Sequence, residues 1–165
     1  MLPVDFDSER YTKKAARVMF LAAYQAREFG SSHIQPEHIL LGIVREDVRL
    51  IKRFIRPHRS MDLIWKQIKE NTIMREQIAP GAVQAISPEG EQVLDLATAE
   101  IRVLGLKQIG TVHLLLGILR EDRSLAAQTL KESGVRLSLV REQLARTPTI
   151  LEQIVRYSRY QARPH

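Results

Sequence analysis

One ten-residue stretch occurs twice in this chain at a fixed spacing. Residues 38–47 read HILLGIVRED and residues 113–122 read HLLLGILRED, an offset of 75 positions. The offset extends upstream, where Gly30 falls on Gly105. Self-similarity at a fixed period identifies a duplicated structural unit before any other signal does. The chain is therefore predicted to contain two copies of one helical unit, which pack on each other as a pseudo-symmetric pair.

The hydrophobic pattern around the repeat is helical. Apolar residues recur at three- and four-residue steps, and no stretch alternates with a period of two for long enough to predict a strand. The fold class predicted is all-α, with about four helices in each repeat. The helices are expected at about residues 12–29, 36–46, 47–56, 60–71, 87–105, 111–121, 122–133 and 136–146.

These boundaries divide a single domain spanning residues 1–165 into four parts. The first repeat covers about 8–71, a connection 72–86, the second repeat about 87–146 and a basic tail 147–165. Residues 1–10 are polar and without periodicity, so they are expected to form a loosely held arm. In the tail, apolar residues beyond Pro148 form a stripe that predicts an additional C-terminal amphipathic helix.

Composition excludes several classes of protein. With 44% hydrophobic and 27% charged residues, the chain has the profile of a folded globular protein rather than a disordered one. It contains no cysteine, which excludes disulfides and thiol chemistry. No apolar run approaches the roughly eighteen residues of a membrane-spanning helix, and the N-terminus lacks the features of a signal peptide. A cytoplasmic protein with no membrane partner is the simplest interpretation.

The net charge of +6 is unevenly distributed. Residues 49–69 contain seven basic residues and one acidic residue, and the last twenty residues contain four basic and one acidic. Such surfaces attract an acidic partner or nucleic acid. The alternative is that they are a solvated helix face and a frayed tail. The strongest candidate for a partner-docking surface is formed by Arg49, Lys52, Arg53 and Arg56.

Signatures of enzymes are missing from the sequence. There is no phosphate-binding loop, dinucleotide fingerprint, nucleophile elbow or H-E-x-x-H motif. His38 and His113 each open a buried helix, but no carboxylate accompanies both, so we interpret them as structural residues rather than metal ligands. We predict no catalytic residues, no metal site, no cofactor and no enzymatic activity.

Glu37 has two interpretations. A carboxylate in the first turn of a helix complements the positive end of the helix dipole, which stabilises a helix by about 0.3–1 kcal/mol. The functional alternative is an anion placed to bind a cationic group, best a guanidinium because it can donate two parallel hydrogen bonds. The equivalent residue of the second repeat is Val112, which can do neither.

The repeated unit resembles a known family. YTKKAARVMFLAAYQAREFGSSHIQPEHILLGIVRED, followed by the second copy SPEGEQVLDLATAEIRVLGLKQIGTVHLLLGILRED, resembles the Clp repeat. This is the duplicated N-terminal domain of Clp-type AAA+ unfoldases, most similar to that of ClpC. The resemblance covers roughly residues 8–146. It implies an all-α domain of eight helices in two pseudo-twofold repeats.

The resemblance also implies a function. In the unfoldases this domain docks substrates and adaptor proteins, while separate ATPase modules do the work. Those modules are not in the 165 residues. A free-standing domain of this kind resembles the small accessory proteins of the plastid Clp protease; a piece of a longer protein would be the receptor end of an unfoldase. Met1 and the additional tail favour the free-standing form. The partners implied are Clp-type ATPase or protease subunits, adaptors and protein substrates, in a role in protein quality control.

ClpC-like domains recognise phosphorylated arginine. The family's pocket uses the glutamate of the E-H-I-L-L-G block and the threonine that opens the first helix. Carried over by position, this implies that Glu37 binds the guanidinium and Thr12 the phosphate. In the second repeat Ser87 replaces the threonine and Val112 the glutamate, so phosphoarginine binding is expected in the first repeat only. The basic third helix departs from the family pattern. It therefore keeps open an alternative function, nucleic-acid binding by residues 49–59 and the tail.

Overall fold

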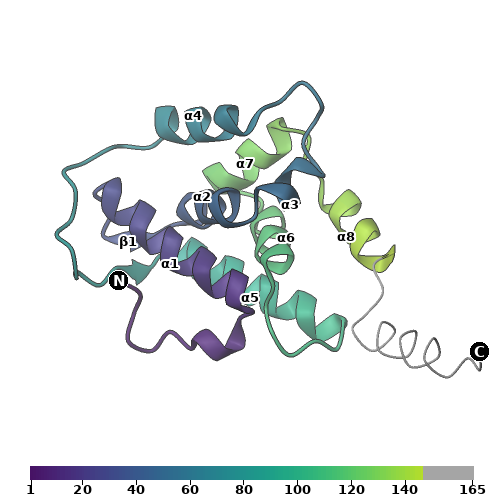
Figure 1. Ribbon diagram of the computed structural model, residues 1–165, viewed down its shortest axis with the longest axis horizontal. Coiled ribbons are helices and arrows are strands. Elements are labelled where there is room, and N and C mark those ends of the chain that lie inside the picture. The colour runs from purple at the N-terminus through teal and green to yellow at the C-terminus, as the bar shows by residue number, and fades with distance from the viewer. Residues whose placement is uncertain (147–165) are drawn as a thin grey trace, which may run out of the picture.

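Two antiparallel helix pairs, one from each repeat, form the centre of the molecule (Figure 1). The computed structural model describes residues 1–146. The first pair is α1 (Lys13–Glu28) with α2 (Pro36–Glu46), and the second is α5 (Pro88–Val103) with α6 (Thr111–Glu121). The shorter elements are η1 (Ser8–Arg10), α3 (Val48–Lys52), α4 (Met61–Asn71), α7 (Leu125–Glu132) and α8 (Leu137–Arg146). The predicted all-α class and the two helical repeats are confirmed.

The ends of the long outer helices are set by the same residue types in both repeats. The Thr12 side-chain oxygen accepts a hydrogen bond from the Ala15 amide at 3.2 Å, and Ser87 does the same for the Gly90 amide at 3.0 Å. Each cap satisfies an amide that would otherwise lack a partner inside the helix. Both helices then stop at a glycine with positive φ, as the sequence predicts.

A glycine in the middle of each inner helix brings the paired helices close together. A Cβ atom built on Gly42 would lie 2.5 Å from the Val18 carbonyl oxygen of α1. One built on Gly117 would lie 2.3 Å from the Val93 carbonyl oxygen of α5. These distances are far shorter than van der Waals contact, so only glycine fits. The glycine within the repeated ten-residue stretch is therefore explained by backbone packing.

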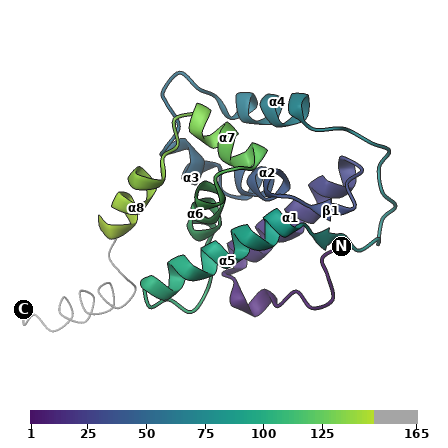
Figure 2. The same ribbon diagram turned by 180° about the vertical axis from the view of Figure 1, so that it is seen from behind.

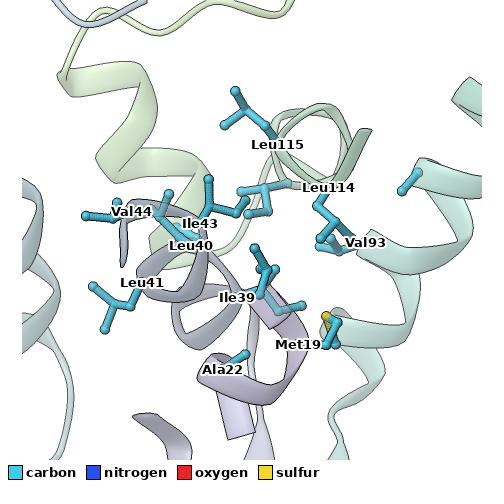
Figure 3. Packing of buried hydrophobic residues seen from close by; sticks show 14 of the residues in the cluster. Met19, Ala22, Ile39, Leu40, Leu41, Ile43, Val44, Val93, Leu114 and Leu115 are labelled. Carbon is cyan, nitrogen blue, oxygen red and sulfur yellow. The ribbon is translucent and has the colours of Figure 1, made fainter. Parts of the chain in front are cut away.

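The two inner helices lie at the centre of the hydrophobic core. Nearly every residue of α2 and α6 is buried, as expected for helices that are apolar on almost all sides. Figure 3 shows Met19, Ile39 and Val93 gathered between α1, α2 and α5; all three are fully buried. Residues of both repeats belong to one continuous hydrophobic cluster. Each repeat therefore completes the core of the other.

Short backbone pairings connect the repeats at their edges. Strand β1 (His33–Ile34) runs parallel to β2 (Ala85–Ile86), and a single parallel bridge joins Tyr11 to Ile109. The 75-residue offset relates these two pairings, because Ile34 corresponds to Ile109 and Tyr11 to Ile86. No strand was predicted here, because two residues are too few to show an alternating pattern. These pairings place the segment before α5 against the start of α2, and the segment before α1 against the start of α6.

Helix α4 crosses from its own repeat to the other. Viewed from either side, it lies above α2 and α7 (Figures 1 and 2), and it packs mainly on α7. The Gln67 side chain donates a hydrogen bond to the Glu132 carboxylate of α7. The connection 72–84 then returns along the end of α1, where the amides of Arg75 and Ile78 donate to carbonyls of Phe29 and Arg27. Helix α4 thus covers part of the other repeat, whereas α8 packs on α6 of its own repeat.

Two local expectations are wrong. The N-terminal arm is held in place: Leu2 is buried, Phe6 stacks on Tyr11 and the Gln84 amide donates to the Met1 carbonyl. The third helix ends at Lys52, four residues earlier than predicted, because the chain turns towards α7 and the Arg56 amide bonds the Ser133 carbonyl at 3.0 Å. The predicted C-terminal amphipathic helix lies outside the described residues.

Replacing either packing glycine by alanine tests the close helix contact. We expect Gly42→Ala and Gly117→Ala each to lower the free energy of unfolding by about 1–3 kcal/mol, because the added methyl group meets a backbone carbonyl that cannot move alone. This loss is expected despite the better helix propensity of alanine, which is worth about 1 kcal/mol. Urea denaturation followed by circular dichroism measures the change.

The matched control is Gln128→Ala, at an exposed position within α7. It should change stability by no more than about 0.5 kcal/mol. If the glycine variants were as stable as this control, the two helix pairs would not depend on close backbone approach.

Candidate functional site

Glu37 is a buried carboxylate that forms no ion pair with the described part of the chain. It is the second residue of α2 and only 8% exposed. None of the ion pairs formed by residues 1–146 involves it. Buried charges are normally paired, because removing a charge from water is costly. An unpaired buried carboxylate at a helix start is therefore the strongest site feature in the described part of the chain.

A polar cavity of about 350 Å³ opens beside Glu37. Three segments surround it: the loop after α1, the first turn of α2, and the end of α4 with the chain that follows. We call it the Glu37 cavity; the residues that line it are Gly30, Ser31, Ser32, His33, Gln35, Glu37, His38, Asn71, Thr72, Ile73 and Arg75. Hydroxyl, amide, imidazole and guanidinium groups thus surround one carboxylate. This composition suits a polar, charged ligand rather than an apolar one.

Burial raises the pKa of the Glu37 carboxyl, and the negative charges of Glu89 and Glu121 raise it further. The hydrogen bond of its own backbone amide acts in the opposite direction. The ionised form of Glu37 is therefore disfavoured in the folded protein. A cation that enters the cavity would relieve this cost, so the electrostatics favour binding of positive charge.

The corresponding region of the second repeat has a different charge pattern. Val112 takes the place of Glu37, and the neighbouring carboxylates are neutralised. Lys14 pairs with Asp47 at 3.5 Å and Arg17 with Glu46 at 2.7 Å. The 75-residue offset places Glu89 at the position of Lys14 and Gln92 at the position of Arg17. The end of the molecule that contains Glu37 therefore has no counterpart of these two cations. The two ends therefore share a backbone but differ in charge.

Thr12 and Glu37 do not lie together. Helices α1 and α2 are antiparallel, with Lys14 beside Asp47, so Thr12 sits roughly 15 Å along the pair from Glu37. Thr12 lies at the start of α6, where its amide donates to the Ile109 carbonyl at 2.9 Å. Ser87 is the residue next to the start of α2, its amide donating to the Ile34 carbonyl at 3.0 Å. The expectation of one pocket made by Glu37 and Thr12 does not match this geometry, because the repeats exchange their capping segments.

The two histidines of the repeated stretch are structural, as interpreted from the sequence. The Nδ1 atom of His38 accepts a hydrogen bond from the Gln35 amide at 2.9 Å, and that of His113 accepts from the Gly110 amide at 2.8 Å. Each imidazole thus caps its own helix. Burial lowers the pKa of His38 to about 4, and burial lowers that of His113 as well. Both rings are therefore neutral near pH 7.

The basic residues of α3 and of the turn that follows it are exposed. We call Arg49, Lys52, Arg53 and Arg56 the basic face. No ion pair within residues 1–146 involves any of the four. The Arg56 side chain packs against Gly134, just after α7, so part of it is not available to a partner. Arg53 also lines a shallow groove with Glu142 and Arg146 of α8, which pair with each other.

Two further observations concern residues 1–146. No three His, Asp or Glu side chains in this part of the chain converge closely enough to hold a metal ion. None of its helices has the length and apolar character needed to cross a bilayer.

Several residues of the Glu37 cavity have no signal in the sequence. Arg75, Asn71 and Thr72 reach it only because the chain after α4 returns along the end of α1. The nearest hint was Gly30: a Cβ there would lie 2.4 Å from the Glu76 carbonyl oxygen, so this glycine permits the returning chain to pass.

The fold thus defines a duplicated helical domain with a buried carboxylate in one half. The sequence matches the Clp repeat (R) N-terminal domain family over residues 3–58 and 85–163. The chain belongs to this family. It resembles the module with which Clp ATPases bind adaptors and substrates.

Comparisons with individual proteins support the same family assignment. The chain is 34% identical over 137 residues to chaperone protein ClpB of Oceanobacillus iheyensis, covering 82% of this chain and 17% of that protein. It is 35% identical over 136 residues to ClpC/MecB, the negative regulator of genetic competence of Bacillus subtilis, covering 82% and 16%. The N-terminal domain of ClpD from Arabidopsis thaliana has the same fold, with a TM-score of 0.63 at 20% identity over 81% of this chain and 94% of that one. The chain spans about a sixth of the length of the curated relatives it matches.

The buried His38 predicts a pH-dependent loss of stability. Because its folded pKa is about 4 and its unfolded value 6.5, the unfolded chain binds an additional proton between these values. Stability from this residue is complete above pH 6.5 and falls by about 3 kcal/mol as the pH decreases to 4. In His38→Asn the side-chain oxygen can replace Nδ1 as the cap but does not titrate. We expect its free energy of unfolding, measured in urea at several pH values, to fall less steeply over this range.

The control is His58→Asn, at an exposed histidine. It should follow the wild-type curve. Parallel curves for wild type and His38→Asn would contradict a buried neutral imidazole.

Proposed function

We propose that this chain is a non-catalytic, cytoplasmic protein-interaction module that binds substrates or adaptor proteins for a Clp-type ATPase or protease. Family membership supports the docking role, since the Clp N-domains of its homologues are interaction modules without catalytic activity. The single observation that points to a ligand is the buried, unpaired Glu37 beside a polar cavity.

The ligand proposed for the cavity is a guanidinium group. A planar guanidinium can donate two parallel hydrogen bonds to one carboxylate, which gives both strength and orientation. Arginine is therefore favoured over lysine, whose ammonium group is more strongly hydrated.

Phosphoarginine is the form of the ligand proposed here. Arg75, Ser31 and Ser32 line the same cavity as Glu37 and could receive the phosphate while Glu37 binds the guanidinium. Thr12 lies at the other end of the molecule and takes no part in this assignment. Val112 supplies no carboxylate, so the second repeat is proposed to lack the site.

The proposal is tested with three peptides of one sequence that carry phosphoarginine, arginine or citrulline at the same position. We expect the phosphoarginine peptide to bind wild type and to lose at least about tenfold in affinity on Glu37→Gln, since one hydrogen bond to a charged group is worth about 1.5–3 kcal/mol. The neutral citrulline peptide should not bind. Isothermal titration calorimetry measures all three. No binding of either charged peptide to wild type ends the proposal.

Glu37→Gln should also fold more stably than wild type near neutral pH. The raised pKa shows that the folded state disfavours the ionised carboxyl, so removing the charge removes a destabilising term. A higher Tm together with lost binding would separate a lost ligand contact from a damaged fold. The opposite replacement, Val112→Glu, provides the matched comparison at the second repeat and should lower the Tm.

Nucleic-acid binding is the second candidate function, favoured by the exposed and unpaired cations of the basic face. With about four phosphate contacts, affinity for duplex DNA should fall about a hundredfold between 50 and 200 mM salt. A protein-docking surface with an apolar centre would keep most of its affinity. Fluorescence anisotropy with labelled DNA, on wild type and Arg53→Glu, distinguishes the two. Salt-independent binding, or binding unchanged by Arg53→Glu, excludes this candidate.

A further inference from the structure

Two aromatic side chains on α1 are exposed to solvent. Phe20 is 55% exposed and Tyr24 is 40% exposed. They are four residues apart, so they are neighbours on one face of the helix. Neither is needed to fill the core, which α1 reaches through its opposite face. Large aromatic rings left on a surface commonly mark an interaction site.

Two arginines flank the Tyr24 ring. The guanidinium carbon of Arg27 lies 5.1 Å from the ring centroid, and that of Arg45 from α2 lies 5.5 Å away. Both distances are within the range of a cation–π contact. Neither arginine takes part in an ion pair with any carboxylate of residues 1–146. We call Phe20, Tyr24, Arg27 and Arg45 the aromatic–arginine face.

The second repeat shows how this charge could have been neutralised. Arg120, the counterpart of Arg45, bonds the Glu100 carboxylate at 3.2 Å, and Arg141 bonds the same carboxylate at 2.6 Å. In the first repeat Gln25 takes the place of Glu100, so no carboxylate is available to Arg45 at that position. The first repeat also has Tyr24 where the second has Ala99. One repeat thus has an internal ion pair where the other has a ring between two free cations.

We propose that the aromatic–arginine face is a docking surface for an acidic protein segment that carries an apolar anchor. Its carboxylates would pair with Arg27 and Arg45, and its apolar side chain would pack on Phe20 and the edge of Tyr24. Charge complementarity selects the occupant: the face offers guanidinium groups that match carboxylates in bidentate geometry. Tyrosine and arginine are also the residue types that contribute most to binding at protein interfaces.

A peptide fits this face better than a single-stranded nucleic acid. Two rings one helical turn apart, about 6 Å, on a convex helix provide an anchor point rather than a track for successive bases. The face is separate from the Glu37 cavity: neither Phe20 nor Tyr24 lines it, and Arg27 and Arg45 do not either. Its occupation therefore does not depend on whether the cavity binds arginine.

The test uses the full chain and a short fluorescent peptide in which a Leu–Phe pair lies between runs of Asp and Glu. We expect saturable binding in fluorescence anisotropy, weakened about tenfold by Tyr24→Ala and by Arg45→Gln. Arg102→Gln is the matched control, because Arg102 is the exposed counterpart of Arg27 in the second repeat. It should leave the affinity unchanged. Circular dichroism confirms that each variant is folded.

Three results would overturn the proposal. The first is equal binding of a peptide with Asn and Gln in place of the acids, and the second is an equal loss on Arg102→Gln. The third is tighter binding of single-stranded oligothymidine than of the acidic peptide, with the same dependence on Tyr24. The arginine peptides should not compete with the acidic peptide, since they are proposed to bind in the Glu37 cavity.

Discussion

The close approach of α1 to α2, and of α5 to α6, is the contact on which the rest of the structure depends. With no side chain at Gly42 and Gly117, the backbone carbonyls of the outer helices lie directly against the inner helices. The inner helices can then be buried on every side and meet at the centre of one shared core. A histidine side chain caps the first turn of each inner helix. The repeated ten-residue stretch therefore encodes a packing unit rather than a catalytic one.

The repeats are joined by exchange, and this decides what lies beside each inner helix. Because Ser87 pairs with the segment before α2 and Thr12 with the segment before α6, each end of the molecule combines residues of both repeats. A change in one repeat therefore alters the surroundings of the other. Glu89, for example, which stands where the first repeat has Lys14, belongs to the second repeat but adds negative charge near Glu37 of the first. Duplication preserved the backbone contacts, which sterics constrain, while charged surface positions were free to diverge.

The two repeats differ in how their charged side chains are paired. Within residues 1–146, Glu37 and Arg45 of the first repeat form no ion pair, whereas the second repeat has the apolar Val112 in place of Glu37 and an Arg120 that is paired with Glu100. A buried, unpaired charge such as that of Glu37 lowers the stability of the free protein, and a partner of opposite charge restores it. Binding sites of this kind therefore cost folding energy, which is consistent with a fold whose stability rests on its apolar centre.

Spacing and residue type along the chain predict the duplication, the all-helical class, the caps of α1 and α5, and the asymmetry between Glu37 and Val112. Tertiary structure alone decided that Thr12 and Glu37 lie at opposite ends, that Arg75 reaches the Glu37 cavity, and that Arg45 stacks on Tyr24. The strand pair was also undetectable, since two residues carry no periodicity. Local propensity acts over one or two helical turns, whereas these contacts join segments many residues apart. Which capping segment meets which inner helix depends on how the repeats exchange, and no local pattern records that choice.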